Sequence, residues 1–469
     1  MTRLRPQLLL LLVVGVVTAQ CAEPADRLWL AGDSHIHSHW SAAVVPRGEN
    51  PPELIKGGGY STPLNAQMAR LYGLSWMVTT DHGGPNHAKF NMTQAYAELK
   101  QSRREVPEVL QFYGMELNMP GMDHHTLIIP NAEDESSVLF EIESQFDADE
   151  AWPRNPARGT EGARLRALDY MKTLPRLPLL FANHPSRSAT AIGQYGLDEP
   201  WELRDNNDRA SAVYRGMEGA PGHAGPHTLG GFDQMTAVVG GLWDSMLGEG
   251  RRFWIVATSD SHVHHTEVSW GDFWPGEFRK TYVHARKTYE DVLDGLRSGR
   301  IFAVTGDLVT QLDVVAAASG RSAEIGGTLR VAAGESVDVM IRFYDPETRN
   351  ANGDNPKVNR VDLILGDVRG PVSDRNADRN ETTRVVARFT DQEWSRNGDV
   401  YSVATTLPAV DRNVYIRVRG TNTEDAEPRM DERGENRWAD LWFYSNPIFI
   451  EVEGVSHAVG TTSASEAPR

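Results

Sequence analysis

The chain has 469 residues, of which 40% are hydrophobic and 24% charged, a composition typical of globular proteins and a length that predicts two domains. Its formal net charge is -17, so it lacks the basic surface that binding to a long nucleic acid requires. We therefore expect no nucleic-acid partner, whereas a small anionic substrate is not excluded.

The first residues have the pattern of an export signal. Arg3 and Arg5 precede an apolar run over residues 8–17, which is too short to span a membrane and is followed by the small residue Ala19. This pattern predicts a signal peptide over residues 1–19 and export to the periplasm or the extracellular space. The single cysteine, Cys21, stands where a bacterial lipoprotein carries its lipid, but Gln20 departs from the usual preceding residue. A lipid anchor and a free thiol are both open at Cys21, and no membrane span is expected.

Between residues 27 and 310, apolar runs of strand length alternate with helical segments, which indicates a parallel α/β sheet. Two helices have readable boundaries: Thr62–Pro63 begins one helix, and Thr288 begins another that ends at Gly299. The seven candidate strands cover residues 28–36, 74–79, 109–117, 125–129, 177–182, 213–218 and 253–258.

Short clusters of histidine and carboxylate residues lie at the end of five of these runs or directly after it. Imidazoles and ionised carboxylates are the common ligands of divalent transition metals, so the repetition predicts a multinuclear metal site rather than a set of structural histidines. The carboxyl ends of the strands of a (β/α) barrel meet at one face, which favours a barrel over an open doubly wound sheet. The clusters are Asp33–His37, Thr80–His82, Gly114–Glu116, Asn183–Pro185 and Ser259–His262.

The sequence pattern changes after Gly306. In segments such as residues 337–343, apolar residues recur at every second position, and turn-forming residues separate these segments. This pattern predicts an all-β sandwich over residues 311–455, after the domain of residues 27–310. Residues 456–469 are rich in Ser, Thr and Ala and are expected to form a disordered tail.

The ordered set of His35-x-His37, Asp81-His82, Glu116, His124 or His125, His184 and Asp260-x-His262 resembles the polymerase and histidinol phosphatase (PHP) superfamily over residues 30–310. The end of the β region, Ser445-Asn446-Pro447-Ile448, is similar to the carbaryl-hydrolase branch (CehA/McbA type). The resemblance implies a distorted seven-stranded (β/α) barrel and two or three divalent ions such as Zn, Mn or Fe.

The resemblance also implies roles for individual residues. His35, His37, Glu116 and Asp260 would hold a first metal, and Glu116 would bridge to a second held by His184 and by His124 or His125. Strand alternation favours His124. His82 and His262 would hold a third metal, but Ser41-Ala42-Ala43 stands where many members carry a carboxylate, so the third site is expected to be weak.

Other polar residues have secondary roles. Asp33 is expected to orient a ligand imidazole, and Arg187 and Arg215 are candidates for clamping an oxyanion. His87, His264 and His265 are expected to be solvated loop residues.

The resulting hypothesis is an exported hydrolase in which a metal-activated water attacks a small phosphoester, with Glu116, Asp260 and Arg187 as catalytic residues. A carbamate or carboxylic ester hydrolase is the first alternative, for which Trp40, Trp76 and Phe181 or Trp243 would line an aromatic pocket. The alternative from another class is a metal-containing binding protein.

Overall fold

The computed structural model describes residues 27–42, 58–222, 228–268, 271–432 and 434–455. The expected signal peptide, the lipid anchor at Cys21, the tail over residues 456–469 and Ala43 lie outside these residues. No helix within the described ranges combines the length and the apolarity needed to cross a membrane.

Each of the seven predicted strand ranges overlaps an observed strand. The seven observed strands are neighbours in chain order within one large sheet. Most adjacent pairs are parallel as expected, but β4 is antiparallel to both β3 and β5. The connection from β3 to β4 covers only residues 119–123, which suffices for a hairpin but not for a crossover helix. The strands are β1 (Leu28–Asp33), β2 (Trp76–Thr79), β3 (Leu110–Asn118), β4 (His124–Ile129), β5 (Leu179–Ala182), β6 (Tyr214–Ala220) and β9 (Trp254–Ala257).

The expected closure of these strands into a barrel is not confirmed. The free edge of β1 pairs with the antiparallel strand β10 (Arg279–Ala285), which pairs in turn with β11 (Ile301–Thr305). Strand β10 also contacts β9, but through a side chain. Oγ1 of Thr281 in β10 accepts from the backbone N–H of Ala257 in β9 and donates to the carbonyl oxygen of Ala257. Beyond the strand ends, an isolated bridge joins Ile36 to Ser261, so the segments after β1 and β9 still meet.

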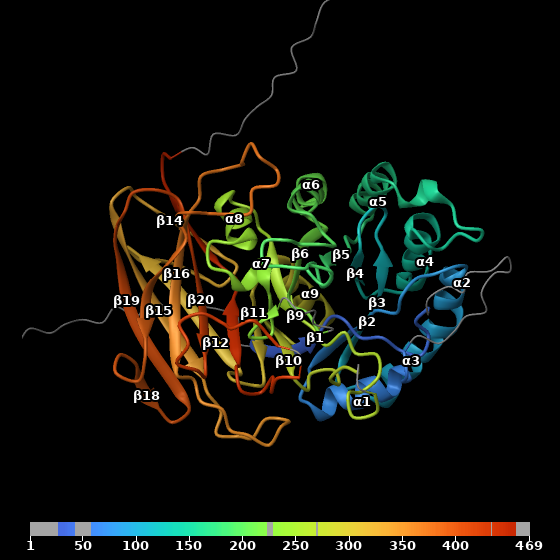
Figure 1. Ribbon diagram of the computed structural model, residues 1–469, viewed down its shortest axis with the longest axis horizontal. Coiled ribbons are helices and arrows are strands. Elements are labelled where there is room, and N and C mark those ends of the chain that lie inside the picture. Colours follow the sequence, from blue (N-terminus) through green and yellow to red (C-terminus); the bar gives the residue numbers. More distant parts are fainter. Residues whose placement is uncertain (1–26, 43–57, 223–227, 269–270, 433, 456–469) are drawn as a thin grey trace, which may run out of the picture.

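Helices cover the sheet around β2 to β6, in the right half of the view in Figure 1. The three boundaries read from the sequence are present. Ser61 Oγ caps the helix that begins at Thr62, Thr288 caps the last helix, and Gly299 ends that helix at a φ of +77°. The helices are α1 (Thr62–Leu71), α2 (His87–Phe90), α3 (Tyr96–Glu105), α4 (Glu135–Phe146), α5 (Glu161–Thr173), α6 (Pro200–Ala210), α7 (Gln234–Ala237), α8 (Leu242–Gly248) and α9 (Tyr289–Ser298), with a π-helical turn (Asn91–Ala95), a 3-10 turn (Pro156–Gly159) and the short hairpin β7 (Thr228–Leu229) and β8 (Phe232–Asp233).

The strands after residue 310 form two sheets that share one apolar cluster. One sheet has the order β13-β12-β15-β19-β18, and the other continues the large sheet, because β21 pairs with β11. Asn446 joins the two parts, since its side-chain amide exchanges two hydrogen bonds with the backbone of Ile255 in β9. The strands are β12 (Gln311–Ala318), β13 (Arg321–Glu324), β14 (Thr328–Val331), β15 (Glu335–Tyr344), β16 (Arg360–Asp367), β17 (Arg384–Phe389), β18 (Ser395–Asn397), β19 (Val400–Val410), β20 (Val414–Thr421), β21 (Trp442–Ser445) and β22 (Ile448–Val452).

His87 at the start of α2 is wholly buried, so the expectation of a solvated side chain is wrong. Its Nδ1 lies 2.5 Å from Oε1 of Glu143, and its Nε2 lies 2.9 Å from the carbonyl oxygen of Trp40. Because both partners are acceptors, the ring donates at both nitrogens and is cationic. Burial by itself would lower the pKa of His87, but the Glu143 carboxylate raises it to about 9.

This ion pair predicts a pH-dependent stability. The pKa of His87 is raised from 6.5 to about 9, so its contribution is complete below about pH 6.5 and is lost as the pH rises through about 9. The free energy of unfolding should fall by at most about 3 kcal/mol over this range, from about 1.36 kcal/mol per pKa unit. Urea unfolding across this range checks it: His87→Gln should show a flatter pH dependence than the wild type, and equal slopes in the two proteins would contradict the assignment.

Candidate metal centre

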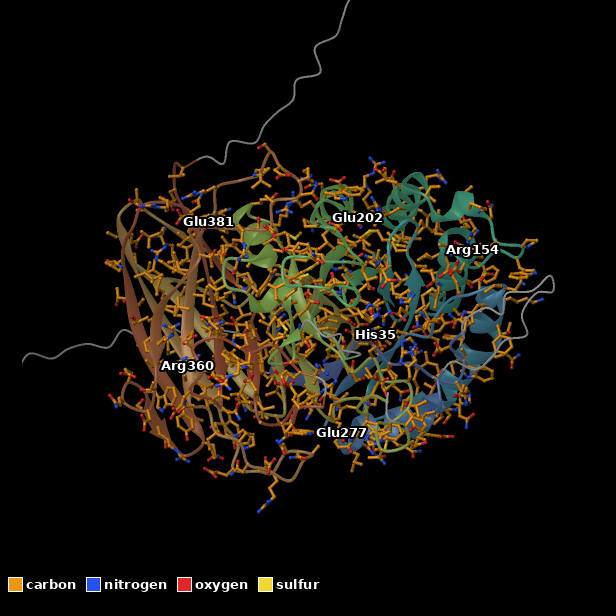
Figure 2. The ribbon with its side chains drawn as sticks, in the orientation of Figure 1. His35, Arg154, Glu202, Glu277, Arg360 and Glu381 are labelled. Atoms are coloured by element: carbon orange, nitrogen blue, oxygen red, sulfur yellow. The ribbon has the colours of Figure 1, made fainter. Side chains whose placement is uncertain are left out.

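The predicted ligands come from six strands or the loops directly after them. His35 and His37 follow β1, His82 follows β2, and Glu116 lies within β3. Further along the chain, His124 begins β4, His184 follows β5, and Asp260 and His262 follow β9. His35, labelled in Figure 2, lies near the middle of the molecule. The structure therefore brings together eight of the nine residues predicted as ligands.

Glu116 is the centre of this group. The carboxylate is 1% exposed, and each of its oxygens faces a different set of imidazoles. Such an arrangement suits a carboxylate that bridges two metal ions. Oε1 lies 3.2 Å from Nδ1 of His124, 3.2 Å from Nε2 of His184 and 3.3 Å from Nε2 of His35, while Oε2 lies 2.8 Å from Nε2 of His82 and 3.3 Å from Nε2 of His37.

Asp260 is the second buried carboxylate of the centre. Its Oδ1 lies 3.1 Å from Nε2 of His37 and 3.3 Å from Nε2 of His35. Asp260 and His184 both have positive φ angles, of +48° and +28°. Residues other than glycine rarely adopt such angles, and strain of this kind is concentrated at functional sites. The backbone is thus bent at two of the residues that place ligand atoms in the centre.

The charges around Glu116 alter the pKa values of the group. Burial alone would raise the pKa of Glu116, but the imidazoles of His82 and His124 hold it well below its usual value. Burial likewise opposes the charged form of His124, yet the Glu116 carboxylate raises the pKa of that ring to about 9. The ionised carboxylate therefore requires positive charge beside it, which protons or metal ions can supply.

The donor atoms fit metal ions better than they fit one another. Five buried atoms of the group make no hydrogen bond among the described residues, although their neighbours are close. Glu116, Asp123, His124 and His184 belong to overlapping groups whose ligand atoms lie within 4.8 Å of one another, and Asp260 contacts His35 and His37. A set of imidazole nitrogens and carboxylate oxygens suits zinc, manganese or iron. The five atoms are Oε2 of Glu116, Nδ1 of His124, Nδ1 of His184, Oδ2 of Asp123 and Oδ2 of Asp260.

His125 lies outside the centre, although it was predicted as an alternative ligand. Its Nε2 lies 3.0 Å from the hydroxyl of Tyr214, and its Nδ1 lies 3.1 Å from the carbonyl oxygen of Asp123. The neighbouring His124 contacts Glu116 instead, because successive side chains of a strand point to opposite faces. Asp123 joins His124 and His184 in a group whose ligand atoms lie within 4.8 Å of one another.

A third group combines His37, His82 and His262, whose ligand atoms also lie within 4.8 Å of one another. This group contains imidazoles and no carboxylate among the residues that the structure describes. Asp272 lies beside this group: its Oδ2 accepts the backbone N–H of His262 at 3.0 Å and also lies 3.3 Å from Nδ1 of the His262 ring. The weak third site therefore stays a prediction.

Two carboxylates outside the ligand set hold it in place. Glu218 in β6 lies 2.6 Å from Nδ1 of His35 through Oε1, and its Oε2 accepts the backbone N–H of His184 at 2.7 Å. Asp33 was expected to orient a ligand imidazole. Instead it accepts the backbone N–H groups of His35 and Ser259, so it fixes the backbone of the site. Sequence reasoning missed Glu218, whose signal is a carboxylate within a largely buried strand segment.

Glu218 leads to a prediction about metal affinity. The carboxylate accepts the Nδ1 proton of His35 and so leaves Nε2 free to bind metal. In Glu218→Gln, the amide weakens this orientation, and metal affinity should fall about 10–100-fold. Competition with a chromogenic chelator measures the affinity, with Glu133→Gln at an exposed position as the control. An unchanged affinity in a folded Glu218→Gln variant would contradict the assigned role.

The two candidate arginines lie in different places. Arg187 is 31% exposed in its side chain, and its guanidinium lies 4.0 Å both from Oδ2 of Asp260 and from Oδ2 of Asp123. Arg215 lies away from the centre: its NH1 donates to the carbonyl oxygen of Ser211, and its guanidinium stacks over the ring of Trp254. Only Arg187 of this pair therefore remains a candidate for binding substrate.

No family model and no curated protein matches the chain. Among solved structures, a similar one is a protein of Bifidobacterium adolescentis assigned as a metal-dependent phosphoesterase. The likeness covers 40% of this chain and 76% of that chain, at 15% sequence identity and a TM-score of 0.22. The function is therefore inferred from the residues of this chain.

Proposed function

We propose that the protein is a metal-dependent hydrolase of small phosphoesters. The observation that carries the proposal is the two-sided contact of Glu116, whose oxygens face imidazoles from four strand ends in a buried space. Five orphaned polar atoms and a bridging carboxylate are what a pair of metal ions would satisfy. A protein that only binds metal would not need Arg187 beside Asp260, where the guanidinium can contact a substrate.

One ion would be held by His35, His37, Asp260 and Glu116, and a second by Glu116, His124 and His184. When bound, divalent ions would supply Lewis-acid chemistry, making water acidic enough to attack near neutral pH and offsetting charge on the ester. Ser41 and Glu218 orient the first ion's imidazoles, since each contacts a Nδ1 atom and leaves Nε2 toward the centre.

Arg187 favours a phosphoester over an uncharged ester. Its guanidinium stands beside Asp260 and Asp123 but reaches neither carboxylate within hydrogen-bond distance. A partly exposed guanidinium with spare donors can hold the non-bridging oxygens of a phosphoryl group in bidentate fashion. The role of Arg187 is thus to position the anionic group of the substrate and to stabilise added charge.

The carbamate alternative loses its expected aromatic pocket. Trp76, Phe181 and Trp243 are each 0% exposed and belong to the main apolar cluster, so they cannot line a substrate pocket. Trp40 remains partly exposed in the loop after β1. The expectation for the other three is wrong because a sequence does not show whether an aromatic side chain faces the core.

A screen of chromogenic esters tests the proposal. Phosphomonoesters and phosphodiesters should be turned over, and EDTA should abolish the turnover. In Arg187→Gln, kcat/KM for the phosphoester should fall about 100-fold, because a charged donor to the transition state is lost. Carbamate turnover exceeding phosphoester turnover, or an Arg187→Gln variant with full phosphoesterase activity, would contradict the proposal. The absence of any turnover by metal-loaded protein would favour a binding role.

We also propose that the protein is exported, which rests on residues 3–19 alone. Fractionation of cells that express the full chain tests this. A shortened protein outside the cytoplasm supports export, and radiolabelled fatty acid incorporated only when Cys21 is present would indicate a lipid anchor.

A further inference from the structure

A second group of metal-type side chains lies apart from the centre around Glu116. His264, His265 and Glu277 each offer one ligand atom, and these atoms lie within 4.8 Å of one another. All three belong to the segment between β9 and β10. Two imidazoles and a carboxylate are a known protein ligand set for zinc, with the remaining position filled by solvent. We propose that this group, the loop site, binds a further divalent transition-metal ion, with zinc the best match.

The contacts of His264 and Glu277 are close to those of a metal site. Nε2 of His264 lies 2.9 Å from Oε2 of Glu277, whereas two ligands of one tetrahedral zinc stand roughly 3.3 Å apart. An ion therefore fits after a movement of a few tenths of an ångström. Nδ1 of His264 lies 2.7 Å from Oγ1 of Thr266, which leaves Nε2 to face Glu277. The same carboxylate oxygen accepts the backbone N–H of Trp274, which holds it in place.

The charge balance of the loop site also favours a cation. Glu277 is only 8% exposed, and the ion pairs of the described residues give it one partner, the imidazole of His264. A buried carboxylate without a permanent cation is costly, and a divalent ion would supply the missing charge. His265, in contrast, is exposed, and its ring centroid lies 4.2 Å from that of His264. An ion can thus reach the site from solvent through His265.

The loop site lies on the segment that places a residue of the main centre. The backbone N–H of His265 donates to the carbonyl oxygen of Asp272 at 2.8 Å, and that of Asp272 donates to the carbonyl oxygen of Val263 at 2.8 Å. Asp272 in turn accepts the backbone N–H of His262. An ion that ties His264 and His265 to Glu277 would therefore stabilise the turn that holds His262.

Zinc content tests the loop site without any measurement of activity. Protein freed of metal is incubated with zinc chloride, passed through a desalting column, and analysed for zinc per chain by mass spectrometry. His265→Ala should hold one zinc ion fewer than the wild type, with the affinity for that ion more than about 10-fold weaker. His265 is exposed, so its replacement should leave the fold intact, which circular dichroism checks. Glu133→Gln is the control, because this exposed residue lies outside the segment and the ligand group.

Three results decide the matter. One zinc ion lost in His265→Ala alone supports the loop site. Equal zinc content in His265→Ala and the wild type overturns it, and so does an equal loss in Glu133→Gln. None of these results depends on turnover, so failure of the proposed phosphoesterase activity would leave the test of the loop site valid.

Discussion

Glu116→Gln should lower kcat for the phosphoester by about 1000-fold or more, since it removes the negative charge that lies between His82 on one side and His124 on the other. The amide keeps the size of the side chain but cannot replace the carboxylate's charge. Metal content should fall together with activity, because the oxygens of Glu116 face both candidate metal positions. Steady-state kinetics and metal analysis on the same preparation measure the two effects.

Glu133→Gln, at an exposed position, is the control and should keep both activity and metal content. Glu116→Gln protein that is folded and retains wild-type turnover would refute the role of Glu116 as the shared ligand. Full metal content with lost turnover would separate catalysis from metal binding and place the role of Glu116 in the reaction alone.

Asp244→Ala should cost about 3–5 kcal/mol of unfolding free energy, because it leaves Arg417 as a buried charge without its carboxylate. Asp244 in α8 and Arg417 in β20 are both 0% exposed in their side chains. Nε and NH2 of Arg417 donate to the two oxygens of Asp244 at 2.8 and 2.7 Å. Tyr415 donates its hydroxyl to the same carboxylate at 2.9 Å, so one acidic residue satisfies two buried groups of the β-rich part.

Urea unfolding measures this effect, with Asp294→Ala as the control. Asp294 forms an ion pair with Arg300, but its side chain is 58% exposed, and exposed pairs contribute less than about 1 kcal/mol. A loss below about 1 kcal/mol in Asp244→Ala would show that the pair is not needed to join α8 to β20. A loss of about 3–5 kcal/mol would support the pair as a link between α8 and β20.

The sequence predicted which side chains lie together better than it predicted the shape of the sheet. Apolar runs followed by histidines and carboxylates are local signals, and the seven strands that they mark are all present in chain order. No local signal in the sequence marks the strand that pairs with the free edge of β1, because that pairing joins segments far apart in the chain. Strand β10 pairs with this edge of β1. The barrel closure, which the strand-end clusters and the resemblance both favoured, is not confirmed.

Some residues that look alike in the sequence have different surroundings in the structure. His87 and His265 are both histidines of polar segments, yet one is wholly buried against Glu143 and the other is exposed. Arg187 and Arg215 were equal candidates until the structure placed one beside Asp260 and the other over Trp254. These differences arise from segments distant along the chain, which no local pattern reports.

By itself, the sequence determined which residue types stand at the ends of the strands, because strand period and ligand chemistry are local properties. The tertiary structure decided which of these side chains share one space. It brought Glu218 of β6 to His35, turned His125 towards Tyr214, and gathered His264, His265 and Glu277 into a separate group. The physical reason is that a metal centre depends on distances between side chains, and these distances are set by the packing of strands far apart in the chain.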